Sequence, residues 1–328
     1  MARVHSALQV EPGKDFVATS FIERVCRRGL AYLEAGYPVH FSGPAGTGKT
    51  TLALHLAGLL GRPVMLVYGD EEFGSSDLLG GDRGVVSKRV IDNFIRSVLK
   101  TEETVRSQWV DHRLTIACKS GYTLVYDEFS RSHAEANNAL LSILQEGVLA
   151  LPEGRGKANY LRVHPDFRAI FTSNPDEYAG VYTPQSALLD RMVTIRLANY
   201  DRDSEVEITR VKSGLAKGCA QKVVDLVRAV RDESQASARL SIRASIMMAQ
   251  ILRHRQGKLT PDDPVLLETC QDVLGSSLAA DGRLQHIIER VLNGSASQPK
   301  EEKECESPSD PGASRTSSTT GKAACRSV

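Results

Sequence analysis

The sequence predicts an α/β fold, with a parallel sheet flanked by helices, followed by a small all-α domain. One observation behind this prediction is that short apolar runs alternate with helical patterns up to residue 198, which is typical of parallel sheets covered on both faces. A second is a glycine-rich loop that joins one apolar run to a helical pattern. A third is that the patterns from residue 199 to residue 292 are all helical.

The large domain is expected over residues 20–198, after an N-terminal extension of residues 1–19. Apolar residues recur every three or four positions over Ser20–Ala35, which indicates an amphipathic helix. Further helices are expected at Thr51–Leu60 and Ala134–Gln145. Short apolar runs predict strands at Pro38–Ser42, Val64–Tyr68, Thr123–Tyr126, Arg168–Thr172 and Val193–Leu197.

Two further segments of the large domain stand apart from these elements. Residues from Gly69 to Gly121 are more than a simple crossover needs, and they hold a glycine-rich stretch and the pattern of a helix near Val90–Arg106. We therefore expect an insertion here. The segment Val148–Val163 has the pattern of a hairpin.

The small domain is expected over residues 199–292, and a disordered tail over residues 293–328. The tail has no aromatic residue, no Leu and no Ile, but eight serines, so it cannot bury enough apolar area to offset the entropy cost of ordering. The helices of the small domain are predicted at Glu205–Val211, Gln221–Val230, Ile242–Leu252, Pro264–Leu278 and Leu284–Leu292.

Composition argues against several classes of function. The 41 Lys and Arg residues nearly balance the 40 Asp and Glu residues, and the formal net charge is +1, so no overall field attracts nucleic acid or an anionic membrane. The sequence contains no basic stripe interleaved with aromatic residues, which argues against a DNA-acting motor. No run reaches the roughly 18 apolar residues of a membrane span, and residues 1–11 lack a signal peptide pattern. We expect a cytoplasmic protein with no nucleic-acid partner and no membrane span.

The cysteines are scattered and include no C-x-x-C pair, which argues against a zinc knuckle or a disulfide framework. We expect reduced thiols at all six positions. These are Cys26, Cys118, Cys219, Cys270, Cys305 and Cys325.

The most informative motif lies between the first predicted strand and the helix that follows it. Residues 43–50 match G-x-x-x-x-G-K-[ST] without a mismatch. In such a loop, backbone N–H groups surround a polyphosphate, the lysine reaches the β- and γ-phosphates, and the hydroxyl at the helix N-terminus binds Mg²⁺. Thr50 is therefore a predicted metal ligand. The predicted nucleotide-binding residues are Gly43, Pro44, Ala45, Gly46, Thr47, Gly48, Lys49, Thr50 and Thr51.

Polar residues follow two later strands. Asp127 and Glu128 close the strand at Thr123–Tyr126, where Asp127 could hold Mg²⁺ and Glu128 could orient and deprotonate the attacking water. Acidic pairs after strands are often solvated strand ends, but a phosphate loop upstream favours the functional interpretation. Asn174 is a candidate to position that water, although an Asn-Pro pair is also a common turn.

Two arginines are candidates to stabilise the charge of a phosphoryl-transfer transition state. Arg191 follows Leu188-Leu189-Asp190, and Arg243 opens a helix of the small domain. A guanidinium supplied to such a transition state is worth roughly 10³ to 10⁵ in rate. As isolated residues they would more often be surface arginines.

Five segments, in this order and spacing, resemble the AAA+ ATPases, specifically their MoxR branch. The resemblance covers about residues 20–290 and implies ATP and Mg²⁺ as cofactors, a P-loop core with a helical lid, and a ring oligomer, a hexamer, with nucleotide at subunit interfaces. It further implies the roles called sensor 1 for Asn174, arginine finger on the adjacent subunit for Arg191, and sensor 2 for Arg243. The segments are Gly43–Thr50, Leu124–Glu128, Phe171–Pro175, Leu188–Arg191 and Ser241–Ala244.

Within this branch, Arg28–Phe41, Tyr68–Gly80 and Ser241–Ile246 resemble the ATPases encoded with gas vesicle shell genes. This resemblance implies an ATP-hydrolysing assembly factor, associated with the gas vesicle, that remodels or delivers gas vesicle shell or accessory proteins. Ala45 and Ile242 each stand where the MoxR pattern often has proline. Neither departure removes a ligand.

The sequence is also compatible with two other functions. A MoxR-type chaperone that inserts a metal or cofactor into a client enzyme would have identical catalytic parts. A structural component of a vesicle surface could bind nucleotide without hydrolysing it. Measured ATP turnover would separate the structural component from both ATPases.

Overall fold

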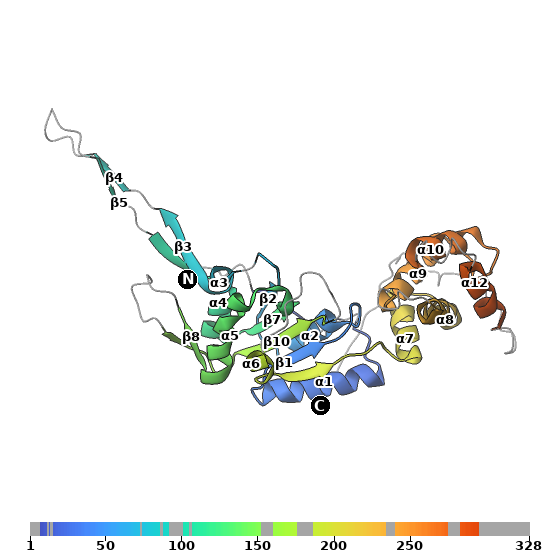
Figure 1. The fold of residues 1–328 in the computed structure, drawn as a ribbon, viewed down its shortest axis with the longest axis horizontal. Helices are drawn as coiled ribbons and strands as arrows, with labels where there is room; N and C mark the ends of the chain where they lie inside the picture. The colour runs from blue at the N-terminus through green and yellow to red at the C-terminus, as the bar shows by residue number, and fades with distance from the viewer. Residues whose placement is uncertain are drawn as a thin grey trace, which may run out of the picture.

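The computed structural model describes residues 7–11, 13, 16–72, 74–85, 88–91, 101–104, 107–151, 160–175, 186–233, 240–274 and 283–294. Within them, a parallel sheet with helices on both faces is followed along the chain by a group of helices (Figure 1). The predicted fold class is confirmed. No helix in these ranges has both the length and the apolar character needed to cross a bilayer.

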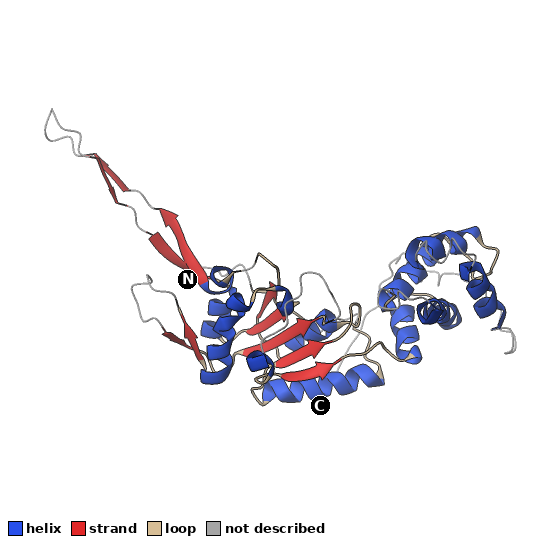
Figure 2. Ribbon diagram, viewed as in Figure 1, coloured by secondary structure: helices blue, strands red, loops and turns tan. Residues whose placement is uncertain are grey.

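The five strands of the sheet are parallel and follow the order β11-β1-β10-β7-β2. Figure 2 shows them in red between the helices. Because β1 lies between β10 and β11, and β7 pairs with β10, the loops that follow β1, β7 and β10 leave one edge of the sheet side by side. The strands are β1 (Val39–Ser42), β2 (Val64–Tyr68), β7 (Thr123–Asp127), β10 (Arg168–Ser173) and β11 (Val193–Arg196), each at a predicted position.

Helices cover both faces of this sheet. The predicted helices α1, α2 and α5 are present, whereas α3, α4 and α6 were not predicted. The elements are α1 (Ser20–Glu34), α2 (Lys49–Leu59), α3 (Ser75–Leu79), α4 (Arg113–Ser120), the short 3₁₀ helix η1 (Phe129–Arg131), α5 (Ala134–Glu146) and α6 (Ser186–Leu189).

Alternate strand residues supply two apolar clusters, one on each face. Tyr126 and Phe171 pack with residues of α4 and α5, whereas Val125 and Ile170 pack with residues of α1 and α2. Burial of each large apolar side chain stabilises the fold by roughly 1.5–3 kcal/mol. The two clusters fix the sheet between layers of helix, and they thereby fix the edge from which the loops after β1, β7 and β10 emerge.

The insertion after β2 is a β-ribbon, so the helix predicted near Val90–Arg106 is wrong where this region is described. Two antiparallel pairs lie one after the other, and Figure 1 shows them projecting from the body of the molecule. The segment contains β-branched residues that favour extended backbone, and the antiparallel partners satisfy each other's backbone groups. Tertiary pairing thus overrode the helical pattern. The pairs are β3 (Gly80–Val85) with β6 (Ser107–Asp111), and β4 (Lys88–Ile91) with β5 (Thr101–Thr104).

The hairpin predicted at Val148–Val163 is present as the antiparallel pair β8 (Val148–Ala150) and β9 (Tyr160–Arg162). Residues 152–159 between these strands lie outside the described ranges.

All five helices predicted after residue 199 are present, and we call this group the lid. Its helices share an apolar cluster of their own, which includes Val227, Met248 and Ile288. Positions 275–278 of the predicted helix at Pro264–Leu278 and the predicted tail after residue 294 lie outside the described residues. The helices are α7 (Arg202–Ser213), α8 (Lys217–Glu233), α9 (Ile242–His254), α10 (Pro264–Leu274) and α12 (Arg283–Gly294).

Candidate functional site

The phosphate loop predicted at residues 43–50 connects β1 to α2. Gly46 and Gly48 have φ angles of 79° and 77°, a left-handed conformation that favours glycine. The Nζ atom of Lys49 donates hydrogen bonds of 2.7 Å to the carbonyl oxygens of Gly43 and Pro44. These bonds hold the ammonium group inside the loop, where a charged phosphate oxygen would be its stronger partner.

Thr50 and Asp127, the two predicted metal ligands, are in direct contact. The Thr50 hydroxyl donates to both carboxylate oxygens of Asp127, at 2.8 and 3.0 Å, and the Thr172 hydroxyl of β10 donates to Asp127 Oδ1 at 2.5 Å. Asp127 is 7% exposed, so these bonds stabilise a largely buried charge. A hydroxyl and a carboxylate are oxygen ligands of the kind Mg²⁺ takes alongside water and substrate phosphates. The residues present therefore fit the predicted metal.

Glu128 has an unusual backbone conformation that the surrounding residues maintain. Its φ is 53°, and its N–H donates to Thr172 Oγ1 at 2.9 Å. Gly69 passes so close that a Cβ there would lie 2.1 Å from the Glu128 carbonyl oxygen. The Glu128 carboxylate pairs with Arg131 Nε at 2.6 Å. A strained backbone held by its neighbours is frequent at functional sites.

Asn174 follows β10 and is 6% exposed. Among the described residues, its Oδ1 atom has no hydrogen-bond partner. An unsatisfied buried amide oxygen costs free energy, and this one belongs to a residue that lines the pocket over the loop. A bound water or ligand donor would satisfy it.

This pocket has a volume of about 230 Å³ and lies between the sheet edge and the lid. Asp127 contacts Thr50 without lining the pocket, and Gly43, Pro44 and Thr47 belong to the loop without lining it. The predicted site residues in the lining are Ala45, Gly46, Gly48, Lys49, Thr50, Thr51, Glu128, Asn174 and Arg243.

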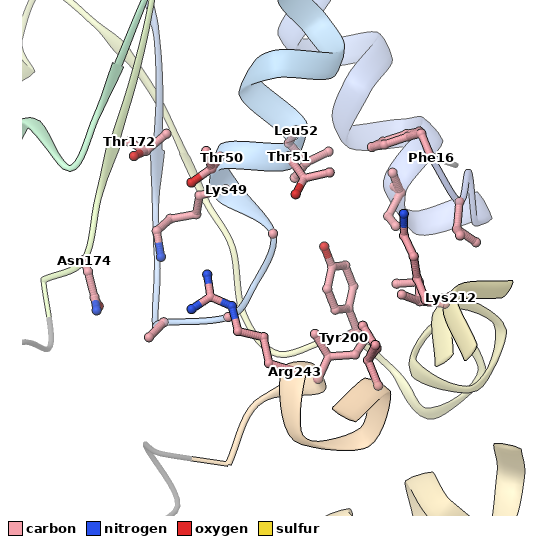
Figure 3. A pocket seen from close by; sticks show the side chains of 18 of the residues that line it. Phe16, Lys49, Thr50, Thr51, Leu52, Thr172, Asn174, Tyr200, Lys212 and Arg243 are labelled. Atoms are coloured by element: carbon pink, nitrogen blue, oxygen red, sulfur yellow. The ribbon is translucent and has the colours of Figure 1, made fainter. Parts of the chain in front are cut away.

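Sequence reasoning missed the residues on the other side of the pocket. Phe16, Tyr200 and Lys212 line it there (Figure 3). The Phe16 ring stacks on His55 with a centroid separation of 3.6 Å, and burial lowers the pKa of His55. No local motif marks these residues, because they come from distant segments. The remaining apolar lining is Val17, Ile22, Leu52, Ile208, Ile242 and Ile246.

Tyr200 connects this side of the pocket to the phosphate loop. Its hydroxyl donates a hydrogen bond of 2.8 Å to the carbonyl oxygen of Thr47. Burial raises the pKa of Tyr200 to about 12, so the hydroxyl stays protonated and remains a donor at neutral pH.

The two predicted arginines occupy different places. Figure 3 shows Arg243 reaching from α9 toward the loop, near Lys49. Arg191 is absent from the lining of this pocket, and its guanidinium donates to the Ala187 carbonyl oxygen and to Gln145 Oε1 of α5. The structure therefore brings Arg243, but not Arg191, to the pocket of its own chain.

None of the cysteines in the described ranges lines the pocket. Cys26, Cys118 and Cys270 are free thiols, and burial raises the pKa of Cys118 to about 12. In the described ranges, no cluster of three or more His, Cys, Asp or Glu side chains is placed to hold a metal ion. Cys305 and Cys325 lie beyond those ranges.

Several known proteins are similar to this chain. The family model of the AAA domain (dynein-related subfamily) matches residues 38–192. The Gas vesicle ATPase GvpN of Ancylobacter aquaticus is 46% identical over 86% of this chain and 79% of its own length. That of Haloferax mediterranei is 43% identical over 84% and 78%. Protein NorQ of Paracoccus denitrificans is 28% identical over 59% of this chain and 64% of its own. A RuvB mutant structure from Thermotoga maritima aligns with a TM-score of 0.49 at 17% identity, covering 78% of this chain and 71% of that one.

Proposed function

This chain belongs to the GvpN family of MoxR-type AAA+ ATPases, and we propose that its ATP hydrolysis drives the remodelling or delivery of gas vesicle proteins during vesicle assembly. One observation supports the chemical part most directly. Lys49, Thr50, Asp127 and Glu128 gather at a single sheet edge, with Thr50 and Asp127 in contact.

The core residues divide the reaction between them. Lys49 exchanges its loop carbonyl partners for phosphate oxygens, and the loop N–H groups hold the rest of the polyphosphate. Thr50 and Asp127 would hold Mg²⁺, which would supply positive charge to offset that of the phosphates. Glu128 accepts the proton of the attacking water, and Asn174 orients that water through its unsatisfied Oδ1.

The arginines supply positive charge from two sources. Arg243 acts within its own chain, because it lines the pocket beside Lys49. Arg191 acts on the nucleotide of an adjacent subunit in a ring oligomer, a hexamer, which accounts for its absence from the lining of the pocket of its own chain. ATP turnover then changes the position of the lid relative to the sheet.

The clients are gas vesicle shell or accessory proteins, and the site of action is the cytoplasm at the growing vesicle. Support for this part comes from relatives that carry the name Gas vesicle ATPase and cover most of the chain. The catalytic residues would be the same in a MoxR-type chaperone that loads a metal or cofactor. The client therefore has to be identified by experiment.

The test is complementation in a host strain that forms gas vesicles and lacks its own copy of this gene. The wild-type chain should restore buoyant cells, and Glu128→Gln should not, because the water-activating carboxylate is lost. Glu135→Gln, an exposed residue on α5, is the matched control and should restore vesicles fully. Vesicles are counted by electron microscopy.

Two results would contradict the proposal. Full restoration by Glu128→Gln would show that hydrolysis is not needed for assembly. Normal vesicles without any copy of the gene, together with loss of a metalloenzyme activity, would identify the client as a cofactor-dependent enzyme. Pull-down of the Glu128→Gln chain with ATP present should retain gas vesicle proteins.

A further inference from the structure

Each left-handed glycine of the phosphate loop lies against a hydroxyl group from the lid side of the pocket. A Cβ on Gly48 would lie 2.6 Å from the Tyr200 hydroxyl oxygen, and a Cβ on Gly46 would lie 2.1 Å from Ser241 Oγ. Tyr200 lies on the segment between β11 and α7, and Ser241 caps α9. The loop therefore contacts the lid side at both of its left-handed glycines.

Tyr200 is itself held from several directions. Its ring packs edge-on against Phe21 with centroids 6.1 Å apart, and the residue is 8% exposed. Its carbonyl oxygen accepts a hydrogen bond of 3.4 Å from Arg228 of α8. Arg228 also forms an ion pair with the buried Glu205 of α7. A side chain supported in this way can hold its hydroxyl at a fixed point.

The hydrogen bond from Tyr200 controls the orientation of one peptide group. In a planar trans peptide, the C=O and N–H point in opposite directions. A Thr47 carbonyl directed at Tyr200 therefore turns the N–H of Gly48 away from Tyr200, which leaves it available to the phosphates. Rotation of this peptide mainly changes ψ of Thr47 and φ of Gly48, and glycine accepts both signs of φ. The backbone preference of Gly48 therefore does not by itself prevent this peptide from rotating. Such a rotation would direct the Thr47 carbonyl, instead of the Gly48 N–H, toward the phosphates.

We propose that Tyr200 is a positioning residue that keeps the Thr47–Gly48 peptide in its phosphate-binding orientation and couples that orientation to the lid. The coupling runs through Arg228 to α7 and α8, since these contacts would change when the lid moves. The proposal rests on nucleotide binding at this loop, not on the role in gas vesicles. Its failure and the failure of the assembly function can therefore be told apart.

The experiment compares ligand binding by the purified wild-type chain with binding by the Tyr200→Phe variant, which keeps the ring and removes the hydroxyl. The probes are ADP, inorganic pyrophosphate and adenosine, each with Mg²⁺. Loss of the buried hydrogen bond should weaken ADP and pyrophosphate binding about five- to tenfold and leave adenosine within about twofold. KM for ATP should rise by the same factor, and kcat should stay within about twofold.

Tyr126→Phe is the matched control. Its hydroxyl is also buried and donates to Ser132 Oγ at 2.8 Å, a partner outside the phosphate loop, and Tyr126 does not belong to the pocket lining, so ADP affinity should be retained. Thermal unfolding checks that both variants are folded. The proposal is overturned if Tyr200→Phe leaves ADP and pyrophosphate binding unchanged, if adenosine binding weakens equally, or if Tyr126→Phe has the same effect.

Discussion

The core half and the lid half of the nucleotide pocket are built in different ways. The core half comprises Lys49, Thr50 and Asp127. Lys49 is bonded within the loop, and the hydrogen bonds between Thr50 and Asp127 are possible because parallel pairing through β10 brings the ends of β1 and β7 to one edge of the sheet. The lid half comprises Tyr200 and Arg243, which reach the loop from segments far along the chain. The bond between Tyr200 and Thr47 spans 153 residues.

The two halves also rest on different kinds of packing. The core half stands on a sheet with an apolar cluster on each face. The lid has an apolar cluster of its own and also a buried carboxylate, Glu205, which pairs with Arg228 and Arg231 at 3.0 Å each. This difference indicates that the sheet fixes the positions of Lys49, Thr50 and Asp127, whereas the lid places its groups through contacts that a movement can change.

The largest expected effect concerns a residue in neither half. Arg191 is absent from the lining of the pocket of its own chain. If it serves the site of an adjacent subunit, as proposed, Arg191→Ala should lower kcat about 10³-fold by removing a guanidinium from that site. An enzyme-coupled phosphate assay measures this. Mixing Arg191→Ala with Glu128→Gln should restore part of the activity, since some interfaces then combine both intact residues. Mixtures as inactive as the separate variants would argue that each chain works alone.

The next effect tests how the lid half is held together. Glu205→Ala should lower the free energy of unfolding by about 3 kcal/mol, because it leaves two arginines beside an empty, buried position. Urea unfolding of the purified chain measures the loss. Glu207→Ala removes the exposed ion pair with Arg210 on the same helix and should cost at most about 1 kcal/mol. Equal losses for the two variants would contradict a special role for the buried charge.

The stability of the sheet that carries the core half should depend on pH. Burial lowers the pKa of His40, on β1, to about 4, where its ring contacts Ser173 Oγ and Thr194 Oγ1. The unfolded chain therefore binds this proton more readily, so the stabilisation is complete above about pH 6.5 and is lost as the pH falls toward 4. We expect a loss of up to about 2 kcal/mol by pH 5, measured by urea unfolding at several pH values. His40→Gln should flatten the profile, and an unchanged slope would assign the effect to other groups.

The smallest effect lies at the junction between the halves. Asp201 caps α7 by accepting a hydrogen bond of 2.8 Å from the N–H of Ser204. Asp201→Ala should destabilise the chain by about 1 kcal/mol, and Asp201→Asn by less, because asparagine is an equally good cap. Thermal unfolding compares the two. If both variants melt alike, the cap contributes little and the start of α7 is fixed by packing.

The core half was predictable because its residues lie in short contiguous motifs. The spacing of Gly43–Thr50 and the position of Asp127 after an apolar strand depend on local backbone geometry, which the sequence displays directly. The sheet then brings these motifs together, as parallel strands must. The lid half was predictable in part: a motif predicted Arg243, which lines the pocket, whereas Tyr200 and Phe16 have no local signature.

The helix predicted near Val90–Arg106 failed for a related reason. Over short segments, a helical pattern and a strand pattern are hard to separate, and pairing between distant segments decides the outcome. In the described part of this region, β3 pairs with β6, and β4 with β5. None of these partners is adjacent enough in sequence for a local pattern to reveal the pairing.

The amino-acid sequence by itself determined the α/β class, the phosphate loop, the acidic pair and the helical character of the lid, because each depends on periodicity or spacing over a few residues. The tertiary structure decided that Tyr200 meets the carbonyl of Thr47, that Phe16 enters the pocket, and that Arg191 stays outside it. These facts depend on how separate elements pack, and packing sums many weak contacts between residues that no short stretch of sequence contains.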